Sequence, residues 1–537
     1  MTVLLTRKAV VQVALEDTYD TAATVGLNDG LLVSNPMFTV KPNVLERNFV
    51  RNDLSPMAFI VGRMLAGMTF DTELRSNGRT NTGLLSNSPL IARLFQACGY
   101  ALTAFAAPSV NGPFVVGDAP TSVAWAVTSA TLASQVYTAT GNFVAGDVQN
   151  IGGKAYTFQT VLTNVDGNVL LGATEAISLA NLKAAVNLGA GAGTLYAAAT
   201  AANPFKIVAT SASTTITISG SAPGAYANAV AVSYTPAGSV EGAWGAATLV
   251  GGVNVAANAD MVEYTLSVVT PGASGTATIQ VNSDTVGETA GAPAVISSGS
   301  AFPVGTLGLQ FTPVFSGLLV AGQKWVVWLR PAGLSLDPVS DSFQSATFAM
   351  HKDGVLHTMP GSYGTFEITA QAGNFASIKW TMTGTYDGPV DDANPAPVFE
   401  TTLPSQVENA RLLVDEFAAV VEKFTFTQGN DIQIRPSVNA SEGYVGVRIV
   451  SRKPEGGIDP EADLVANNDF WDQMSAAQRM PFQMRVGFVP GNTIWVTAPC
   501  TQYSGLTYAD RNGILVYDAG LRFSRVLGND EVSFFFA

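Results

Sequence analysis

The chain has 537 residues and a formal net charge of −14, with 41 acidic and 27 basic side chains. This length exceeds one ordinary core and predicts two to four domains. The acidic balance excludes a protein that grips nucleic acid, because gripping requires Lys and Arg to displace counterions. It leaves open a surface past which nucleic acid slides. Abundant glycine (52 residues) and only 13% charged residues predict a mainly β protein with much interface.

The two cysteines, Cys98 and Cys500, fit neither a disulfide framework nor a metal site. We expect two buried thiols in a reducing compartment. The N-terminus lacks the apolar core of a signal peptide, and no run reaches the ~18 apolar residues of a membrane span. The sequence therefore predicts synthesis in the cytosol and no membrane insertion.

The first elements are strands over residues 10–15 and 31–40. Residues 41–55 then form a charged, extended segment without apolar periodicity. One interpretation is a solvated loop; the other is an arm that contacts a neighbouring subunit, since long loops usually have a purpose. The charged residues that we assign to such a contact arm are Glu46, Arg47, Arg51 and Asp53.

A long strand over residues 60–74 precedes a helix that begins at Ser88-Pro89. Serine suits the N-cap, proline suits the first helical position, and Gly99 suits the position just after the helix. Apolar residues recur between them at helical spacing. We expect this helix to plug one end or face of a sheet.

Composition changes sharply after residue 107, because only eight charged residues lie between 101 and 254. We interpret residues 108–254 as a small α+β module with a linker, whose helix spans 179–187 with Ser178 as its cap and Gly189 at its end. Residues 255–333 read as a β-sandwich module of strands and turns. Both interrupt a domain made of residues 1–107 and 334–537, as insertions at a loop commonly do.

The second part of that domain opens with a four-strand meander over residues 343–386, around which the chain is organised. Asp353-Gly354 predicts a type I′ hairpin turn, because both residues tolerate positive φ. Counting outward from the turn pairs Lys352 with Val355, Met350 with His357 and Phe348 with Met359. Further strands follow to the C-terminus, with one helix expected over residues 468–479.

No pattern predicts catalysis, a cofactor or a metal site. His351 and His357 are expected on opposite faces of the hairpin, which disfavours a shared metal. The glycine-rich run 189–193 lacks the Lys-Ser/Thr of a phosphate loop. The acidic groups Asp391-Asp392 and Asp459/Glu461/Asp463 lack calcium-loop spacing and are interpreted as solvated loops.

Several motifs, in this order along the chain, together resemble a bacteriophage tail tube (major tail) protein. The resemblance covers about residues 1–107 and 334–537. The motifs are EDTYDTAA from Glu16, VLERNFVR from Val44, the helix from Pro89 to Cys98 with Gly99, KDGVLH from Lys352, WTMTG from Trp380 and VSRKPEG from Val450.

The resemblance implies a tail-tube-type β-sandwich or barrel with a flanking helix. Six copies would close a ring by joining their sheets into an inner barrel, and rings would stack into a tube that conducts double-stranded DNA into the host. The implied partners are other copies of the chain, tail terminator and distal tail or baseplate proteins, and the tape measure protein and genomic DNA in the lumen. Residues 108–333 depart from the family's shorter chain, and their first half resembles modules that decorate phage structural proteins.

Residues outside 101–333 carry a net charge of −10, so the resemblance also implies an acidic bore past which DNA slides. Acidity that serves only solubility is the alternative. Two other function classes stay open: a phage or bacterial surface-binding protein built of immunoglobulin-like modules, and an enzyme on a β scaffold. The interrupted layout disfavours the first, and the lack of a polar catalytic cluster disfavours the second.

Overall fold

The fold is mainly β, as the sequence predicts, with 51% of residues in strands and 7% in helices. It is taken from a computed structural model. The model describes all residues except 1–3, 6, 48, 51, 53–54, 56, 79–84, 86–87, 106–107, 117–122, 128–131, 206, 222–226, 253–260, 286–287, 289–292, 306, 409, 441–442 and 490. Within the described residues, no helix is both long and apolar enough to cross a membrane.

Residues from both ends of the chain build one large domain, in which pairings connect seventeen strands. The described strands do not close it into a barrel. Its first layer runs, in order of pairing, through β3 (Ser34–Leu45), β4 (Ile60–Glu73), β25 (Ser377–Thr385), β24 (Val355–Gln371), β28 (Val421–Thr427), β31 (Glu455–Pro460), β34 (Ile514–Phe523) and β33 (Ile494–Arg511).

Two long strands turn the corners of this domain. β33 pairs with β34 through its second half and with β32 and β35 through its first half, which starts a second layer. β24 likewise leaves the first layer near Gly361 and joins a third ladder. The remaining strands are β27 (Leu413–Val414), β32 (Met480–Val486), β35 (Ser533–Phe536), β22 (Gly333–Pro338) and β5 (Tyr100–Phe105) in the second layer, and β2 (Gly30–Leu31), β1 (Ala9–Leu15), β23 (Ala346–Lys352) and β26 (Asp387–Asp391) in the third ladder.

The short helix α1 (Ile91–Ala97) fills the centre of the domain. The Phe95 ring packs edge-on against Phe366 and Trp380, at centroid distances of 4.9 and 5.1 Å. The helix starts later than the sequence predicts, and Ser88 is not its cap. Instead the backbone N–H of Leu90 donates to Oε1 of Glu400 at 2.9 Å, so a distant carboxylate satisfies the helix terminus.

The hairpin of β23 and β24 has the register that the Asp353-Gly354 turn predicts. Asp353 and Gly354 take φ values of 49° and 104°, so both lie in the left-handed region. The remaining short elements are η1 (Leu27–Asp29), the hairpin β29 (Asn430–Pro436) with β30 (Tyr444–Arg452), and α3 (Phe470–Ser475). Helix α3 is shorter than the predicted 468–479 and buries only Phe470 completely.

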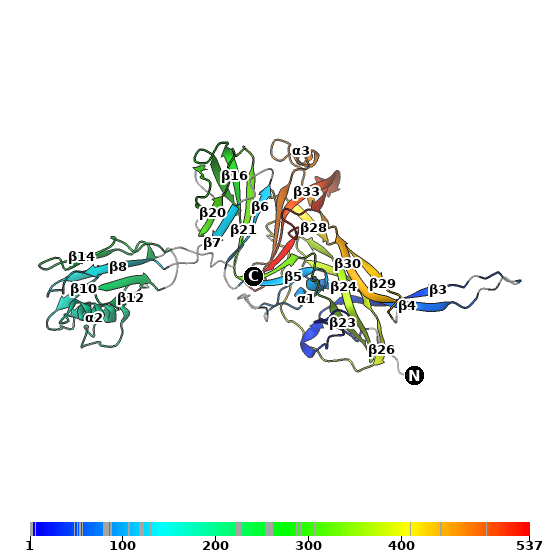
Figure 1. Cartoon of the computed structure of the whole chain (residues 1–537), viewed down its shortest axis with the longest axis horizontal. Coiled ribbons are helices and arrows are strands. Elements are labelled where there is room, and N and C mark those ends of the chain that lie inside the picture. Colours follow the sequence, from blue (N-terminus) through cyan, green and yellow to red (C-terminus); the bar gives the residue numbers. More distant parts are fainter. Residues whose placement is uncertain are drawn as a thin grey trace.

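A β-sandwich module packs beside the large domain (Figure 1). Its two sheets contain β18 (Ala294–Val295), β17 (Thr278–Ser283), β16 (Val262–Thr270), β21 (Lys324–Arg330) and β6 (Ser109–Val116), and β19 (Phe302–Val304), β20 (Leu309–Pro313) and β7 (Val123–Val127). Residues 109–127 therefore pair with this module and not with the α+β module, to which the sequence analysis assigned them. The expected division at 254/255 misses this, because β6 and β7 find their partners about 200 residues later in the chain.

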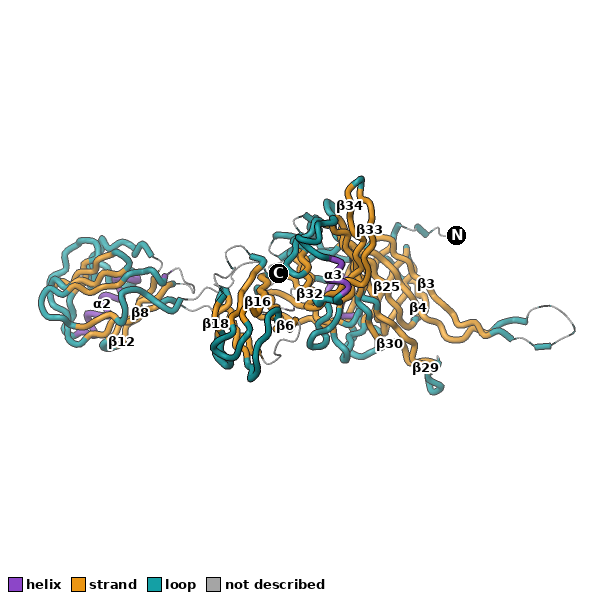
Figure 2. The backbone as a smooth tube through the Cα atoms, turned by 90° about the horizontal axis from the view of Figure 1, so that it is seen from above, coloured by secondary structure: helices purple, strands orange, loops and turns teal. Residues whose placement is uncertain are grey.

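The α+β module is thus nested inside the sandwich module. It contains β8 (Ser134–Ala139), β9 (Val148–Ile151), β10 (Lys154–Gln159), β11 (Asn168–Leu170), α2 (Glu175–Asn187), β12 (Ile207–Ala212), β13 (Thr215–Gly220), β14 (Val232–Thr235) and β15 (Gly242–Trp244). Its core cluster consists of its own residues, and its two ends meet where Ser134 bridges Val250. Figure 2 shows it as a separate body at one end of the molecule.

Helix α2 begins four residues before its predicted start. Thr174 is its N-cap and accepts a hydrogen bond from the backbone N–H of Ile177. The predicted cap, Ser178, lies inside the helix, where its hydroxyl donates to Oδ1 of Asn142 and accepts from the backbone N–H of Gly172. Both residues are hydrogen-bonding hydroxyls near the start of an apolar run, so sequence alone did not separate them.

Two consecutive ladders, in separate sheets, lie where the sandwich module joins the large domain. β5 pairs with β22 from Tyr100–Pro338 to Phe105–Gly333, and β6 pairs with β21 from Ser109–Arg330 onward. At the junction the guanidinium of Arg330 is buried, donates to Oγ of Ser335 at 2.9 Å and lies over the Phe105 and Phe535 rings. The pairing on the large-domain side ends at Phe105–Gly333, and the pairing in the module begins at Ser109–Arg330.

A mixed apolar and polar face joins the two bodies. Trp328 of the module lies in one buried cluster with Trp495 and Phe535 of the large domain. Its indole Nε1–H lies 2.8 Å from Oε2 of Glu263 and 3.0 Å from Oε1 of Gln483. Such a buried, hydrogen-bonded contact makes this module part of the main body.

Candidate self-assembly interface

A β-hairpin projects from the large domain, at the right of Figure 1. It is the outer part of β3 and β4, where pairing continues from Lys41–Leu65 to Leu45–Ile60. Among the described strands β3 pairs only with β4, so its other edge is open. We call residues 41–63 the projecting hairpin.

The projecting hairpin exposes several large apolar side chains among its described residues. Phe49 is 65% exposed, Phe59 59% and Ile60 53%. Val44, Leu45, Val61 and Met64 are also exposed. A two-stranded ribbon cannot build its own core, and soluble proteins rarely expose contiguous apolar patches of this kind unless they bind something. The hairpin is therefore the strongest candidate for a binding surface.

The base of the hairpin is held firmly. The Tyr444 hydroxyl of β30 donates to the backbone carbonyl of Met64 at 2.7 Å. On the other strand, the Phe38 ring stacks on His357 at a centroid distance of 4.9 Å, and Tyr386 packs against both rings. These contacts fix the direction in which the ribbon leaves the domain.

Of the four residues assigned to the arm, Glu46 and Arg47 lie in the projecting hairpin and are exposed. The Arg47 guanidinium lies 5.6 Å from the centre of the Phe49 ring. Arg51 and Asp53 lie outside the described residues. The segment was expected to be a loop, but residues 41–45 are strand, because an edge strand tolerates Pro42 at a register shift.

The motif that begins at Glu16 forms a buried junction of loops. The Glu16 carboxylate accepts hydrogen bonds from Oγ of Ser345, Oγ1 of Thr347 and the backbone N–H of Gly361, at 2.6, 2.7 and 2.8 Å. Gly361 lies where β24 changes ladders and has φ of 58°. The backbone N–H of Asp20 donates to Oε2 of Glu16 at 3.0 Å, so four donors satisfy the carboxylate and make it a stable structural element.

Tyr19 continues this junction to the hairpin of β29 and β30. Its hydroxyl accepts from the backbone N–H of Val447 and donates to the carbonyl of the same residue, at 2.6 and 2.8 Å. Burial raises the pKa of Tyr19 to about 12. Burial also raises the pKa of Asp20, against a hydrogen bond from Thr385 that lowers it. The motif thus serves packing between strands, a role that its sequence did not reveal.

The Asp353-Gly354 turn is a second anchoring point. Asp353 Oδ2 accepts from the backbone N–H of Leu5 at 2.6 Å, and its Oδ1 lies 3.5 Å from Lys8 Nζ. The turn thereby binds the N-terminal segment.

The groups considered for chemistry are dispersed. His351 is buried and His357 is half-buried on the other face, and burial lowers the pKa of both. Cys98 and Cys500 are buried and free. In the part of the chain that the structure describes, no group of three or more His, Cys, Asp or Glu side chains is placed to hold a metal ion.

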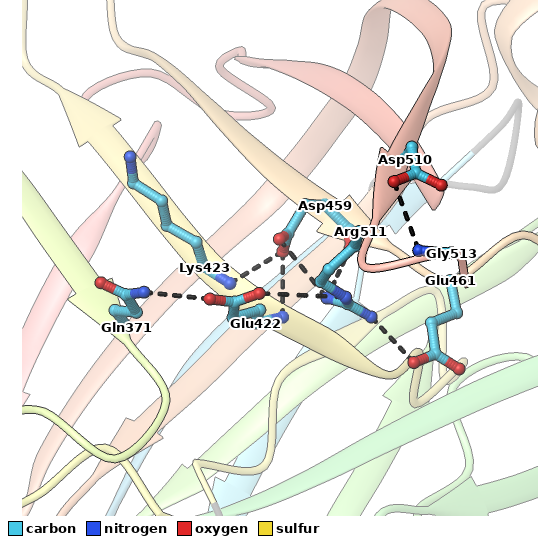
Figure 3. Close-up of polar contacts among 8 residues, drawn as sticks. All are labelled: Gln371, Glu422, Lys423, Asp459, Glu461, Asp510, Arg511 and Gly513. Carbon is cyan, nitrogen blue, oxygen red and sulfur yellow. Dashed lines mark hydrogen bonds and ion pairs between the residues drawn. The ribbon is translucent and has the colours of Figure 1, made fainter. Parts of the chain in front are cut away.

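Carboxylates gather where β28, β31 and the tip of the β33–β34 hairpin meet (Figure 3). The Arg511 guanidinium contacts Glu461 at 2.8 Å, Asp459 at 3.4 Å and Glu422 at 3.9 Å. Gln371 donates to the other oxygen of Glu422 at 3.0 Å. Three partly exposed carboxylates share one cation, so an excess of negative charge remains at this surface. We call Glu422, Asp459, Glu461 and Arg511 the Arg511 cluster.

Beside the Arg511 cluster lies an open cleft of about 550 Å³. Its floor is apolar, with Val407, Phe424 and Met484 buried in it. Glu422 lines both the cleft and the cluster. This size falls within the range of about 300–1,000 Å³ that is typical of binding pockets. Nothing in the sequence pattern indicated it, because its walls come from four separate segments.

No protein-family model matches the sequence, and a search of curated proteins found no match to it. The functional inference therefore depends on the hairpin, the cleft and the way the two insertions are attached.

Proposed function

We propose that the protein is a structural subunit that assembles with copies of itself into hexameric rings, which stack into a phage tail tube that conducts double-stranded DNA. The observation that carries this proposal is the projecting hairpin, an apolar ribbon with an open edge on an otherwise well-packed β domain. Exposed apolar surface and unpaired strand edges are liabilities that association removes. Such a subunit would act in the virion tail after synthesis in the host cytoplasm.

The two insertions support an outward position for this part of the chain. They lie together on one side of the large domain, away from the projecting hairpin (Figure 1). Six copies of such bulk would block a central bore. We therefore place the sandwich module and the nested module on the tube exterior. The implied partners remain a tail terminator, distal tail or baseplate proteins, and the tape measure protein and DNA in the lumen.

The charge of the large domain suits a conduit. Residues outside 101–333 carry a net charge of −10. A like-charged wall repels DNA, so the DNA stays hydrated and central and no Lys or Arg holds individual phosphates. A structure of the assembled tube tests this part alone, because a neutral or positive bore would contradict it without affecting self-assembly.

Electron microscopy of the purified chain tests the main proposal. We expect hollow rods of constant diameter. A variant in which residues 41–63 are replaced by a short turn should remain folded and soluble but form no rods. A chain that stays monomeric at high concentration would contradict the proposal and favour a surface-binding protein, which glycan binding by the isolated nested module would then support.

A further inference from the structure

The cleft and the projecting hairpin lie at opposite ends of the same sheet. β4 runs from Ile60 in the hairpin to Glu73, which pairs with Ser377 beside the turn between β24 and β25. At that turn β24 ends at Gln371, which pairs with Lys423 at the cleft. At about 3.3 Å per residue, the fourteen residues of β4 span roughly 45 Å. The hairpin therefore cannot reach the cleft of its own chain.

The charges of the two ends are complementary. Residues 41–63 contain four basic and two acidic side chains, in a chain whose net charge is −14. At the other end, the Arg511 cluster has three carboxylates for one guanidinium. Three further cations line the cleft: Arg411, which is paired with Asp284 of the sandwich module, Lys423, and Arg485, whose guanidinium lies over the Phe488 and Trp495 rings. The excess of carboxylates is on the side of the cleft formed by Glu422.

The apolar surfaces are complementary as well. The hairpin exposes Leu45, Phe59 and Ile60. The cleft offers an apolar floor of Val407, Phe424 and Met484, with Ala418 exposed at its mouth. Aromatic and aliphatic anchors that enter a pocket, with charges around the rim, are the usual arrangement of an interface hot spot.

We propose that the apolar cleft, together with the Arg511 cluster, is the receptor for the projecting hairpin of a second copy of this chain. This inference rests on the proposed self-assembly and names the surface that receives the arm. Donor and acceptor are different surfaces at opposite ends of the sheet, so the contact is heterologous. A heterologous contact is not self-limiting, and it propagates from copy to copy unless rotation closes it.

Two variants that each keep one of the surfaces test the proposal. The first carries Phe59→Asp and Ile60→Asp, which remove the apolar anchors of the hairpin. The second carries Ala418→Arg, which fills the mouth of the cleft with a cation. Alone, each should raise the concentration needed for elongation at least about tenfold. When the two variants are mixed one to one, the intact hairpins of the second should bind the intact clefts of the first. Neither product then offers a matching pair of surfaces, so growth should stop, and sedimentation velocity should show a doubled mass.

Controls separate a lost contact from a lost fold. Val161→Asp, at an exposed position of the nested module, should elongate normally. Glu422→Gln gives a second acceptor variant of nearly unchanged shape, and its elongation should weaken and depend less on salt than that of the unmodified chain. Circular dichroism should show the same β content for all variants.

The results distinguish failure of this inference from failure of the proposed function. Normal rods from Ala418→Arg, or a mixture that does not join, would overturn the cleft as receptor and leave self-assembly standing. Absence of rods from the unmodified chain would overturn both. A mixture that joins once and stops would establish the pairing of these two surfaces.

Discussion

The two inserted modules lie in one interruption of the chain but are attached in different ways. The nested module has its own core and meets itself at the Ser134–Val250 bridge. The sandwich module follows the β5–β22 ladder with its own β6–β21 ladder and buries Trp328 against Trp495 of the large domain. An insertion in sequence is therefore not always an appendage in structure. The first module is added to the fold, whereas the second has become part of it.

Deletion should give the largest difference between them. Joining Val127 to Met261 by a short Gly-Ser linker removes the nested module and should leave a folded protein that still assembles. Joining Phe105 to Gly333 removes both modules and exposes Trp495 and Phe535. Each aromatic ring exposes about 150–250 Å², which at about 25 cal/mol per Å² costs several kcal/mol for the pair.

Soluble expression and thermal unfolding measure this difference. In the full chain we expect one unfolding transition for the nested module and one for the large domain with the sandwich module. The shorter deletion should melt within about 3 °C of the second of these transitions. The longer deletion should aggregate. The sequence layout describes residues 108–333 as two insertions in one domain, and these deletions test whether both can be removed. Equal behaviour of the two deletions would remove the distinction between the modules.

Single tryptophan substitutions should sharpen the comparison. Trp328→Ala opens a cavity at the shared face and should cost about 3–5 kcal/mol of unfolding free energy. In calorimetry the transition of the large domain should fall, while that of the nested module stays in place. Trp244→Ala is the matched control, because Trp244 packs against the nested core and should lower only the nested transition.

A buried carboxyl at the shared face should make its stability depend on pH. Burial, and next the nearby Asp284, raise the pKa of Glu263 to about 8. The folded state therefore holds a proton that the unfolded state releases near pH 4.5. The contribution of Glu263 to stability is therefore fully present below pH 4.5 and is lost as pH rises toward 8, by at most about 1.4 kcal/mol per pH unit.

The variant Glu263→Gln isolates this carboxyl. Its large-domain transition should lose the part of the pH dependence between 4.5 and 8 and should melt higher than the unmodified chain at pH 8. The nested transition should be the same in both proteins. Parallel pH profiles of the two large-domain transitions would show that Glu263 does not titrate in this range.

The smallest effect should come from the surface of the nested module. Lys154 Nζ lies 2.6 Å from Oδ1 of Asp166, and hydrogen bonds from Lys154 and Ala201 lower the pKa of that carboxyl. Asp166→Asn should cost less than about 1 kcal/mol, because the pair is exposed on the Asp166 side. Only the nested transition should shift, and the effect should vanish below the folded pKa of Asp166. If Asp166→Asn changed the extent of rod formation, the stability of the nested module would be coupled to assembly by the large domain.

Local sequence patterns predicted the elements whose determinants are local. The Asp353-Gly354 turn sets its own register, and the alternation around Trp380 places that strand's apolar face inward. Patterns failed where a distant residue decides. The start of α1 depends on Glu400, and the assignment of 109–127 depends on strands near residue 310 and beyond.

The candidate site divides in the same way. Charge without periodicity correctly singled out residues 41–55 as unusual, although it hid the strand that extends to Leu45. The cleft could not be found from sequence, because Val407, Phe424 and Met484 each read as ordinary core residues. The Arg511 cluster could be found only in part: Asp459 and Glu461 read as a solvated loop, and their cation comes from a hairpin 50 residues later.

The two consecutive ladders, β5 with β22 and β6 with β21, also have a mechanical consequence. A pull on the nested module reaches the large domain along the axis of these paired strands. Hydrogen bonds in an antiparallel ladder lie perpendicular to the strands, so such a load shears many of them at once and does not open them one after another. The paired strands therefore form a stiff connection. Force applied to the nested module is transmitted through β22 to β35 and the C-terminal residues of the large domain.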